Sequence, residues 1–240
     1  MSMTLLQICN NFALRTSLPQ SASVGGSTTF EQLRGLLQEI LDDLLSRYTF
    51  QGVVEEAQFT TNGAVNFQGS LADIAPLGFL RIRPKTFFNR SLRIEVPGPL
   101  TASEFQALQT ISHSGPISWY RIRADALFMD PIPGDGNLCV FEYISECAVL
   151  GPAPAYTRKQ YPTDDGDTFL LPDKLLLAGL RWRWKAEKGF DYAEEFAAYE
   201  ALAKQLSANS EGARPINLDG QGVDARPGVI VPAGTWITPS

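Results

Sequence analysis

The chain has 240 residues, of which 44% are hydrophobic and 19% charged, and it carries a formal net charge of -6 with an isoelectric point near 4.9. This composition is typical of a folded protein with one large or two small domains and excludes a disordered chain. The acidic balance argues against a general nucleic-acid binder, because phosphate binding requires clustered lysine and arginine. A protein that surrounds DNA without gripping it is still compatible with this charge.

Two helices are predicted within residues 1–49. The first carries apolar residues at helical spacing and is expected to end before Pro19. Thr28 and Glu31 are spaced as a capping box, which predicts the start of the second helix. Its apolar stripe continues for about 20 residues, or roughly 30 Å. The stripe consists of Leu33, Leu36, Leu37, Ile40, Leu41, Leu44, Leu45 and Tyr48.

Residues 50–171 are predicted to be mainly β-structure. Five short segments are rich in β-branched and aromatic residues and predict strands: VVEEAQFT, FLRIRP, SLRIEVPG, ISWYRIR and LCVFEYIS. In the third, Leu92, Ile94 and Val96 are expected on the buried face of the strand. One helix interrupts this region after a second capping box, Thr101 with Glu104. The Pro-rich stretch 150–168 is expected to be a loop.

Residues 172–208 predict two antiparallel helices joined by a short turn. Pro172 suits the first turn of a helix, and Gly189 suits its end. Asp191 with Glu194 is predicted to cap the second helix. The expected stripes are Leu176, Leu177, Leu180 and Trp184, then Phe196, Tyr199, Leu202 and Leu206. The predicted fold is therefore α+β: a bundle of N- and C-terminal helices with an inserted small antiparallel β region.

Charges are segregated between these two C-terminal helices. The first is mainly basic and the second mainly acidic, which in part only reflects the helix dipole. Two interpretations stay open for the remainder, a solvated face and a contact between neighbouring subunits. Trp184 is assigned to the core and Trp182 to the interface, because helical residues two apart face different sides. The candidate interface residues are Trp182, Arg181, Arg183, Lys185, Glu194 and Glu195.

Residues 209–240 are predicted to form an extended C-terminal arm. Four prolines keep it out of a helix, and about thirty residues reach roughly 100 Å when fully extended. Its apolar residues have no internal partner in the predicted fold: Val229, Ile230, Val231, Trp236 and Ile237. The segment GVIVPAG suits addition of a strand to the sheet edge of a partner. The alternative is an arm that is frayed or folds back on its own subunit.

No catalytic, cofactor or metal site is expected. The single histidine, His113, is accompanied by no nucleophile motif, and the chain contains no phosphate-binding glycine motif. The acidic loops DDGD and DPIPGDG do not match calcium-loop spacing and are expected to be solvated turns. Cys9, Cys139 and Cys147 are expected to be buried free thiols in a reducing compartment. No signal peptide or membrane span is predicted.

Several stretches, in this order, are similar to bacteriophage head-to-tail adaptor proteins, the family with tail tubular protein A-like members. They are MTLLQICNNFALRTSLP, SVGGSTTFEQLRGLLQEI, GSLADIAP, IEVPGPLTASEFQALQ and LAGLRWRWKAEKGFDYAEEFAAYEALAKQL, and together they span about Met3 to Leu206. These motifs are structural and carry no catalytic signature. The resemblance implies a structural virion protein at the head-tail interface, assembled in the host cytoplasm. It implies a ring, typically of twelve copies, between the portal protein and a downstream tail or nozzle protein.

In that family a C-terminal extension docks into the portal, and genomic DNA passes through the lumen of the ring. The resemblance therefore assigns the five apolar arm residues to portal binding. We expect the DNA to pass without specific binding. The competing hypothesis is a stand-alone ligand-binding or hydrolytic α+β domain, with a cleft around His113, Trp119 and Tyr120.

Overall fold

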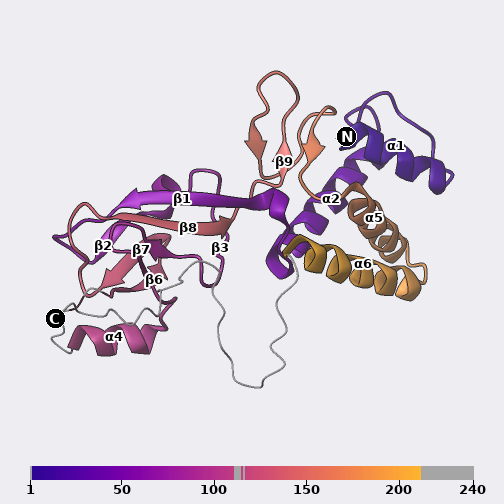
Figure 1. Ribbon diagram of the computed structural model, residues 1–240. Coiled ribbons are helices and arrows are strands. Elements are labelled where there is room, and N and C mark those ends of the chain that lie inside the picture. The colour runs from indigo at the N-terminus through magenta and orange to yellow at the C-terminus, as the bar shows by residue number, and fades with distance from the viewer. Residues whose placement is uncertain (1, 111–114, 116, 212–240) are drawn as a thin grey trace, which may run out of the picture.

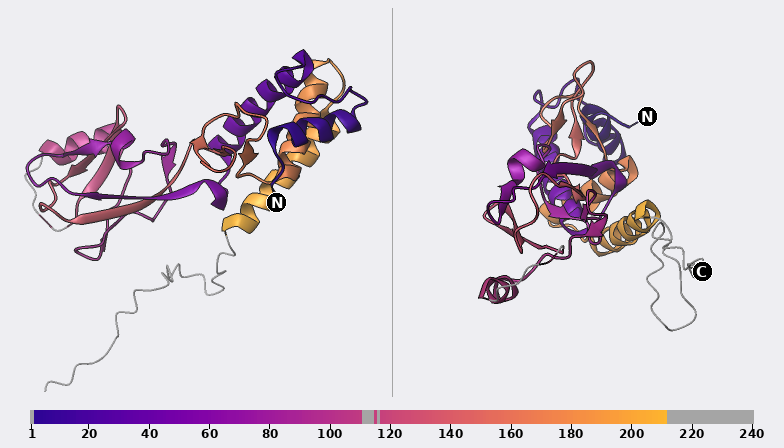
Figure 2. Two further views of the ribbon diagram at one scale, coloured as in Figure 1. Left: turned by 90° about the horizontal axis from the view of Figure 1, so that it is seen from above. Right: turned by 60° about the vertical axis from the view of Figure 1, so that its left-hand side comes forward.

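Two hydrophobic cores organise the chain, one among helices and one within the β region. In the computed structural model, residues 2–110, 115 and 117–211 are described. Helices and small antiparallel sheets are mixed along this part of the chain, which confirms the α+β class (Figure 1). The helical core and the β core lie at opposite ends of an elongated molecule (Figure 2).

Helix α1 spans Leu5–Arg15 and buries the predicted residues Leu5, Ile8, Cys9 and Phe12. It begins with a capping box that the sequence analysis did not identify. The Thr4 N–H donates to Gln7 Oε1 at 3.0 Å, and the Gln7 N–H donates to Thr4 Oγ1 at 3.3 Å. These two bonds satisfy donors that the start of a helix leaves without partners.

Helix α2 spans Thr28–Arg47, which is 20 residues as predicted, and its apolar stripe from Leu33 to Leu45 is buried. The predicted capping box is wrong. Ser27 is the N-cap residue, with the extended backbone (φ -145°, ψ 124°) that this position requires, and Thr28 is already helical. A reciprocal capping box of Thr28 and Glu31 would require Thr28 to be the N-cap residue. The helix begins one residue too early for this.

Helices α5 (Asp173–Glu187) and α6 (Ala193–Glu211) form the C-terminal pair. Pro172 lies one position before α5, as its N-cap. Gly189 ends the helix as predicted: its φ is 73°, its N–H donates to the Ala186 carbonyl at 3.1 Å, and the next N–H donates to Lys185 at 2.9 Å. Asp191 Oδ1 accepts from the Ala193 N–H at 3.1 Å at the start of α6. Helix α6 continues three residues past the predicted boundary at 208.

The four long helices bury side chains in one shared core, in which α5 contacts α1, α2 and α6. Gly179 of α5 packs directly on Ile40 of α2, where an added Cβ would lie 3.0 Å from Ile40 Cγ2. The half-buried Trp184 meets Phe12 of α1 edge-on, with the ring centroids 5.8 Å apart. Trp184 thus packs against the core, as predicted.

The β region is built around strand β8 (Leu138–Ile144). It pairs with β1 (Val54–Thr60) over seven residues, from Val54 opposite Ile144 to Thr60 opposite Leu138. Strand β8 also pairs with the two-residue strands β3 (Arg81–Ile82) and β4 (Phe88–Asn89), and β5 (Ile94–Glu95) pairs with β4. The 3₁₀ turn η1 (Gln51–Val53) leads from the helical core into β1.

A second sheet has the order β2 (Phe67–Ser70), β7 (Ala126–Asp130), β6 (Trp119–Arg123). The short helix α3 (Leu71–Ile74) follows β2, and α4 (Ala102–Thr110) starts at the predicted capping box. The Thr101 N–H donates to Glu104 Oε2 at 2.8 Å, and the Glu104 N–H donates to Thr101 Oγ1 at 3.3 Å.

Two predictions in the β region are wrong. The stretch predicted as a loop contains the strand β10 (Arg158–Lys159). The strands β9 (Val149–Leu150) and β11 (Thr168–Phe169) lie at its two ends. These three strands form a third sheet. Val149 and Phe169 pack on the helical core. Leu92 is 45% exposed, because residues 90–93 form the turn between β4 and β5 and Arg93 has a φ of 58°.

Gly179→Leu should lower the free energy of unfolding by roughly 1–3 kcal/mol, because the new side chain has to displace Ile40 from a close-packed contact. Gly35→Leu on α2 is the matched control, since nothing lies within 4 Å of its Cβ position. Replacing a helical glycine there should leave stability unchanged or raise it by up to ~1 kcal/mol. Urea unfolding followed by circular dichroism measures both. Equal losses in the two variants would contradict the packing described.

Candidate functional site

Three of the predicted interface residues form ion pairs within the chain. Arg183 pairs with Glu39 of α2, and its guanidinium carbon lies 4.8 Å from the centre of the Trp182 ring. Lys185 pairs with Glu195 across the α5–α6 contact, and this hydrogen bond lowers the pKa of Glu195 below its ordinary value. Part of the charge segregation is thus neutralised between α5 and its neighbours. These three side chains hold the helices together.

Trp182 lies in an aromatic cluster between α5 and α6. The ring centroids of Phe196, Tyr199 and Tyr192 are 5.1, 5.9 and 6.1 Å from that of Trp182. Its Nε1 is buried without a hydrogen-bond partner among the described residues, so packing alone holds the ring. Tyr199 is buried, as the predicted stripe requires.

Three aromatic residues at the α5–α6 turn are exposed. Phe190 is 64% exposed, Tyr192 43% and Phe196 38%. The exposure of Phe196 corrects its prediction as an internal stripe residue: its ring contacts that of Trp182, but the residue is not enclosed by the core. We call Phe190, Tyr192 and Phe196 the aromatic corner. Aromatic residues are enriched among the residues that dominate protein–protein contacts.

A groove of about 280 Å³ lies between α2 and α5. It is lined by Gln32, Gly35, Leu36, Glu39, Trp184, Glu187 and Lys188. Lys188 Nζ lies 4.5 Å from the centre of the Trp184 ring, a cation–π contact at the rim. We call this feature the α2–α5 groove. The sequence analysis placed Trp184 in the core but did not predict an opening beside it.

The remaining predicted interface residues, Arg181 and Glu194, are exposed. Neither forms an ion pair within the described residues, and the same holds for Asp191 and Lys188. Arg181 and Lys188 are seven positions apart, which places them on one side of α5. Glu194 and Asp191 lie beside the aromatic corner in sequence. Of these four unpaired charges, the two basic ones lie at α5 and the two acidic ones near the start of α6, while Glu187 of α5 is also exposed without an ion pair among the described residues.

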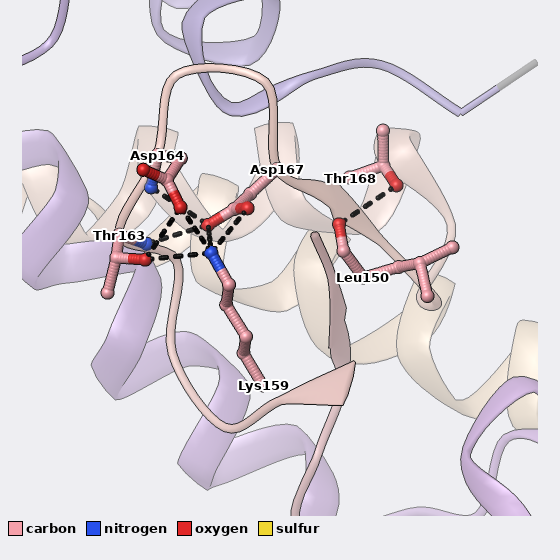
Figure 3. Close-up of polar contacts among 6 residues, drawn as sticks. All are labelled: Leu150, Lys159, Thr163, Asp164, Asp167 and Thr168. Carbon is pink, nitrogen blue, oxygen red and sulfur yellow. Dashed lines mark hydrogen bonds and ion pairs between the residues drawn. The ribbon is translucent and has the colours of Figure 1, made fainter. Parts of the chain in front are cut away.

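The DDGD loop is not a solvated turn, which corrects the sequence prediction. Asp167 is fully buried and accepts from the Thr163 N–H at 2.7 Å, the Asp164 N–H at 2.9 Å and Lys159 Nζ at 3.0 Å (Figure 3). Asp165 Oδ1 accepts from the Val24 N–H at 3.0 Å. A short local acidic sequence cannot reveal this burial, because the partners are set by the third sheet.

This loop also binds the start of α1. The Leu5 N–H donates to the Asp167 carbonyl at 2.7 Å, and the Leu6 N–H donates to the Asp165 carbonyl at 3.2 Å. These are donors that the first turn of a helix leaves free. Hydrogen bonds to Asp164 and Asp167 raise the pKa of Lys159, so the amine is protonated at neutral pH and does not act as a base. The arrangement is a structural clasp rather than a catalytic group.

A cleft around His113, Trp119 and Tyr120 was the competing hypothesis. In the structure, Tyr120 lies in the β core. Its ring centroid is 4.9 Å from that of Phe87, and burial raises its pKa to about 12. Trp119 is half-buried, and His113 lies outside the described residues. A groove of about 480 Å³ occurs on another face, over β4 and β8. Its rim includes an ion pair between Arg90 and Glu56 at 2.8 Å.

The thiols are free, with Cys9 and Cys139 buried and Cys147 half-buried. Burial raises the pKa of both Cys9 and Cys139 to about 12, so these two are protonated and unsuited to nucleophilic attack. Within the described ranges, no group of three or more histidine, cysteine or acidic residues is placed to hold a metal ion. The predicted arm residues Val229, Ile230, Val231, Trp236 and Ile237 lie outside the described residues.

Neither a protein-family model nor a curated protein matches this sequence. Among the described helices, none combines the length and the apolar character that a membrane crossing requires.

Replacing Asp167 with Ala should lower the free energy of unfolding by about 3 kcal/mol or more, because Lys159 and two backbone N–H groups lose their buried acceptor. Asp164→Ala is the matched control. Its side chain is 59% exposed and also pairs with Lys159, so its loss should cost under ~1 kcal/mol. Chemical denaturation at neutral pH compares the two. A smaller effect at Asp167 than at Asp164 would refute the clasp.

Proposed function

We propose that this protein is a structural head-to-tail adaptor of a tailed bacteriophage, without enzymatic activity. In this proposal about a dozen copies form a ring between the portal and a downstream tail or nozzle protein. The observation that supports it is the distribution of the resembling stretches. They coincide with α1, the first half of α2, the β2–α3 junction, the β5–α4 junction and the α5–α6 pair. The resemblance thus involves several separate helices and strand–helix junctions and not one local motif.

The helical core supports a ring-forming role. Helices from both ends of the chain bury one shared set of side chains, which we interpret as the adaptor bundle. The surfaces of this bundle differ: unpaired basic side chains project from α5, and unpaired acidic side chains and exposed aromatics lie at the start of α6. A subunit with two different contact surfaces associates head to tail, and head-to-tail contacts close into rings when the rotation permits.

The arm supplies the proposed portal contact. Helix α6 ends at Glu211, and residues 212–240 follow it, enough chain to reach roughly 100 Å when extended. Trp236 and Ile237, with Val229 to Val231, are the apolar side chains near the end of this segment that we assign to the partner contact. In the proposed assembly each subunit inserts its arm into the portal, so the attachment is multivalent.

Deleting residues 228–240 should abolish stable docking to the portal while the folded domain keeps its unfolding temperature. Docking is lost because the apolar anchors are removed, and the core residues that the structure describes are all retained. Trp236→Ala alone should weaken each contact by ~2 kcal/mol or more. Co-sedimentation with purified portal measures docking, and calorimetry measures stability. A truncated protein that unfolds, with docking retained, would show that the arm belongs to its own subunit.

Binding to duplex DNA should be weak and independent of sequence at physiological salt. The net charge of -6 disfavours the counterion release that drives tight binding, and a lumen that does not retain DNA lets it slide. Fluorescence anisotropy with two unrelated duplexes tests this directly. Nanomolar binding that differs between the duplexes would overturn the conduit role.

A further inference from the structure

The aromatic corner has the composition of a binding anchor. Phe190 and Tyr192 expose much of their surface, and Phe196 adds an exposed edge beside the half-buried Trp182. Aromatic residues of this kind contribute strongly to protein–protein contacts when they enter a fitted pocket. The corner lies on a rigid base, because Trp182 packs against the buried Tyr199 and the turn itself is closed by the hydrogen bonds of Gly189.

The α2–α5 groove has room for such an anchor. Its volume of about 280 Å³ equals that of roughly nine water molecules at ~30 Å³ each, and a phenylalanine side chain has only seven heavy atoms. Trp184 and Leu36 supply apolar surface, and Gly35 has no side chain to fill the space. An incoming aromatic ring would find both an apolar wall and the cation of Lys188 at the rim.

The corner and the groove lie on opposite sides of α5 at the same end of the helix. Trp182 faces the corner, and Trp184 lines the groove. Side chains two residues apart on a helix point in directions that differ by roughly 160°, and they are separated by only ~3 Å along the helix axis. A contact from the corner of one copy to the groove of another therefore runs across α5 with little rise. Such a head-to-tail contact closes into a ring when the rotation between successive copies permits.

The unpaired charges agree with this pairing. Lys188 lines the groove and Arg181 projects from the same side of α5, whereas Asp191 and Glu194 flank the corner. None of the four has an ion pair within the described part of its own chain. Glu39 and Glu187 also line the groove: Glu39 pairs with Arg183, whereas Glu187 has no ion pair among the described residues and shares the groove with Lys188. Docking the corner would bring the acidic pair toward Lys188.

We propose that the aromatic corner of one copy docks into the α2–α5 groove of the next copy, as the contact that joins subunits of the ring. This inference rests on the proposed adaptor function, since it names the surfaces through which that ring would form. It also separates the predicted interface residues: Trp182 and Glu194 belong to the corner side, and Arg181 to the groove side. Arg183, Lys185 and Glu195 support both surfaces from within the subunit.

The test uses one variant for each surface. Phe190→Ala removes the most exposed corner residue, and Gly35→Leu fills the groove without a clash inside the subunit. Full-length protein, half of it labelled with heavy isotopes, is treated with a zero-length carbodiimide at low salt, alone and with portal. Wild-type protein should give cross-links from Lys188 to Asp191 or Glu194 that join a labelled copy to an unlabelled copy. Each single variant should reduce their yield at least tenfold.

Mixing the two variants should restore these links but stop at dimers, because the Phe190→Ala copy keeps its groove and the Gly35→Leu copy keeps its corner. Tyr156→Ala, at a residue 58% exposed, and Ala201→Leu, on the exposed side of α6, are the matched controls and should behave as wild type. Links that persist in both variants, a mixture no better than either variant alone, or no links in wild type with or without portal would overturn the contact.

Portal co-sedimentation distinguishes this contact from the adaptor role. Links between copies without portal binding would support the contact and defeat the adaptor function. Portal-bound rings that form normally from both variants would overturn the contact and leave the adaptor function standing. Binding of DNA in place of a second copy, abolished by Lys188→Glu and unaffected by Phe190→Ala, would also overturn it.

Discussion

The close packing of α5 against α2 is the constraint on which the described surfaces depend. Gly179 allows the two helices to approach until its Cα lies against Ile40, and this approach brings Arg183 within reach of Glu39. With α5 fixed in this position, one side of the helix faces α6 and carries Trp182, and the other side carries Trp184 and opens as the α2–α5 groove. A larger residue at Gly179 would separate the helices and change both surfaces together, because packed cores transmit displacements.

The clasp and the β1–β8 pair connect segments that are distant in sequence. The buried carboxylate of Asp167 organises the loop whose carbonyls satisfy the first donors of α1, so the start of α1 is held by residues about 160 positions later. Strands β1 and β8 run from the helical core into the β core as one paired ribbon. The two cores are therefore joined by backbone hydrogen bonds as well as by covalent connection. Such a link suits a subunit that has to keep two contact regions at a set separation.

The proposal that this protein binds other proteins draws on the chemistry of the described residues. Several of its ionisable groups have structural uses: Asp167 and Lys159 in the clasp, Tyr120 in the β core, and Cys9 and Cys139 as buried, protonated thiols. The exposed features are aromatic side chains and unpaired charges arranged on different sides of the helical core. The adaptor proposal gives these surfaces a common purpose, since a ring subunit has to present a different surface to each neighbour.

Apolar periodicity by itself predicted the long helices and the strands around β1, β6 and β8. The spacing of Thr101 and Glu104 predicted the capping of α4. These features depend on residues close together in the chain. The sequence also predicted that Trp182 and Trp184 lie on different sides of α5, and it left open whether the charged faces of the α5–α6 pair are solvated or form a subunit contact. It did not indicate the hairpin from β6 to β7, whose turn places Ala124 and Asp125 at positive φ without the usual glycine or asparagine. Only the tertiary structure decided which charges are already paired. Arg183 and Glu39 are 144 positions apart, and Asp167 is buried by a sheet of two-residue strands. Ion pairing and burial depend on distances in space, and local sequence patterns do not specify those distances.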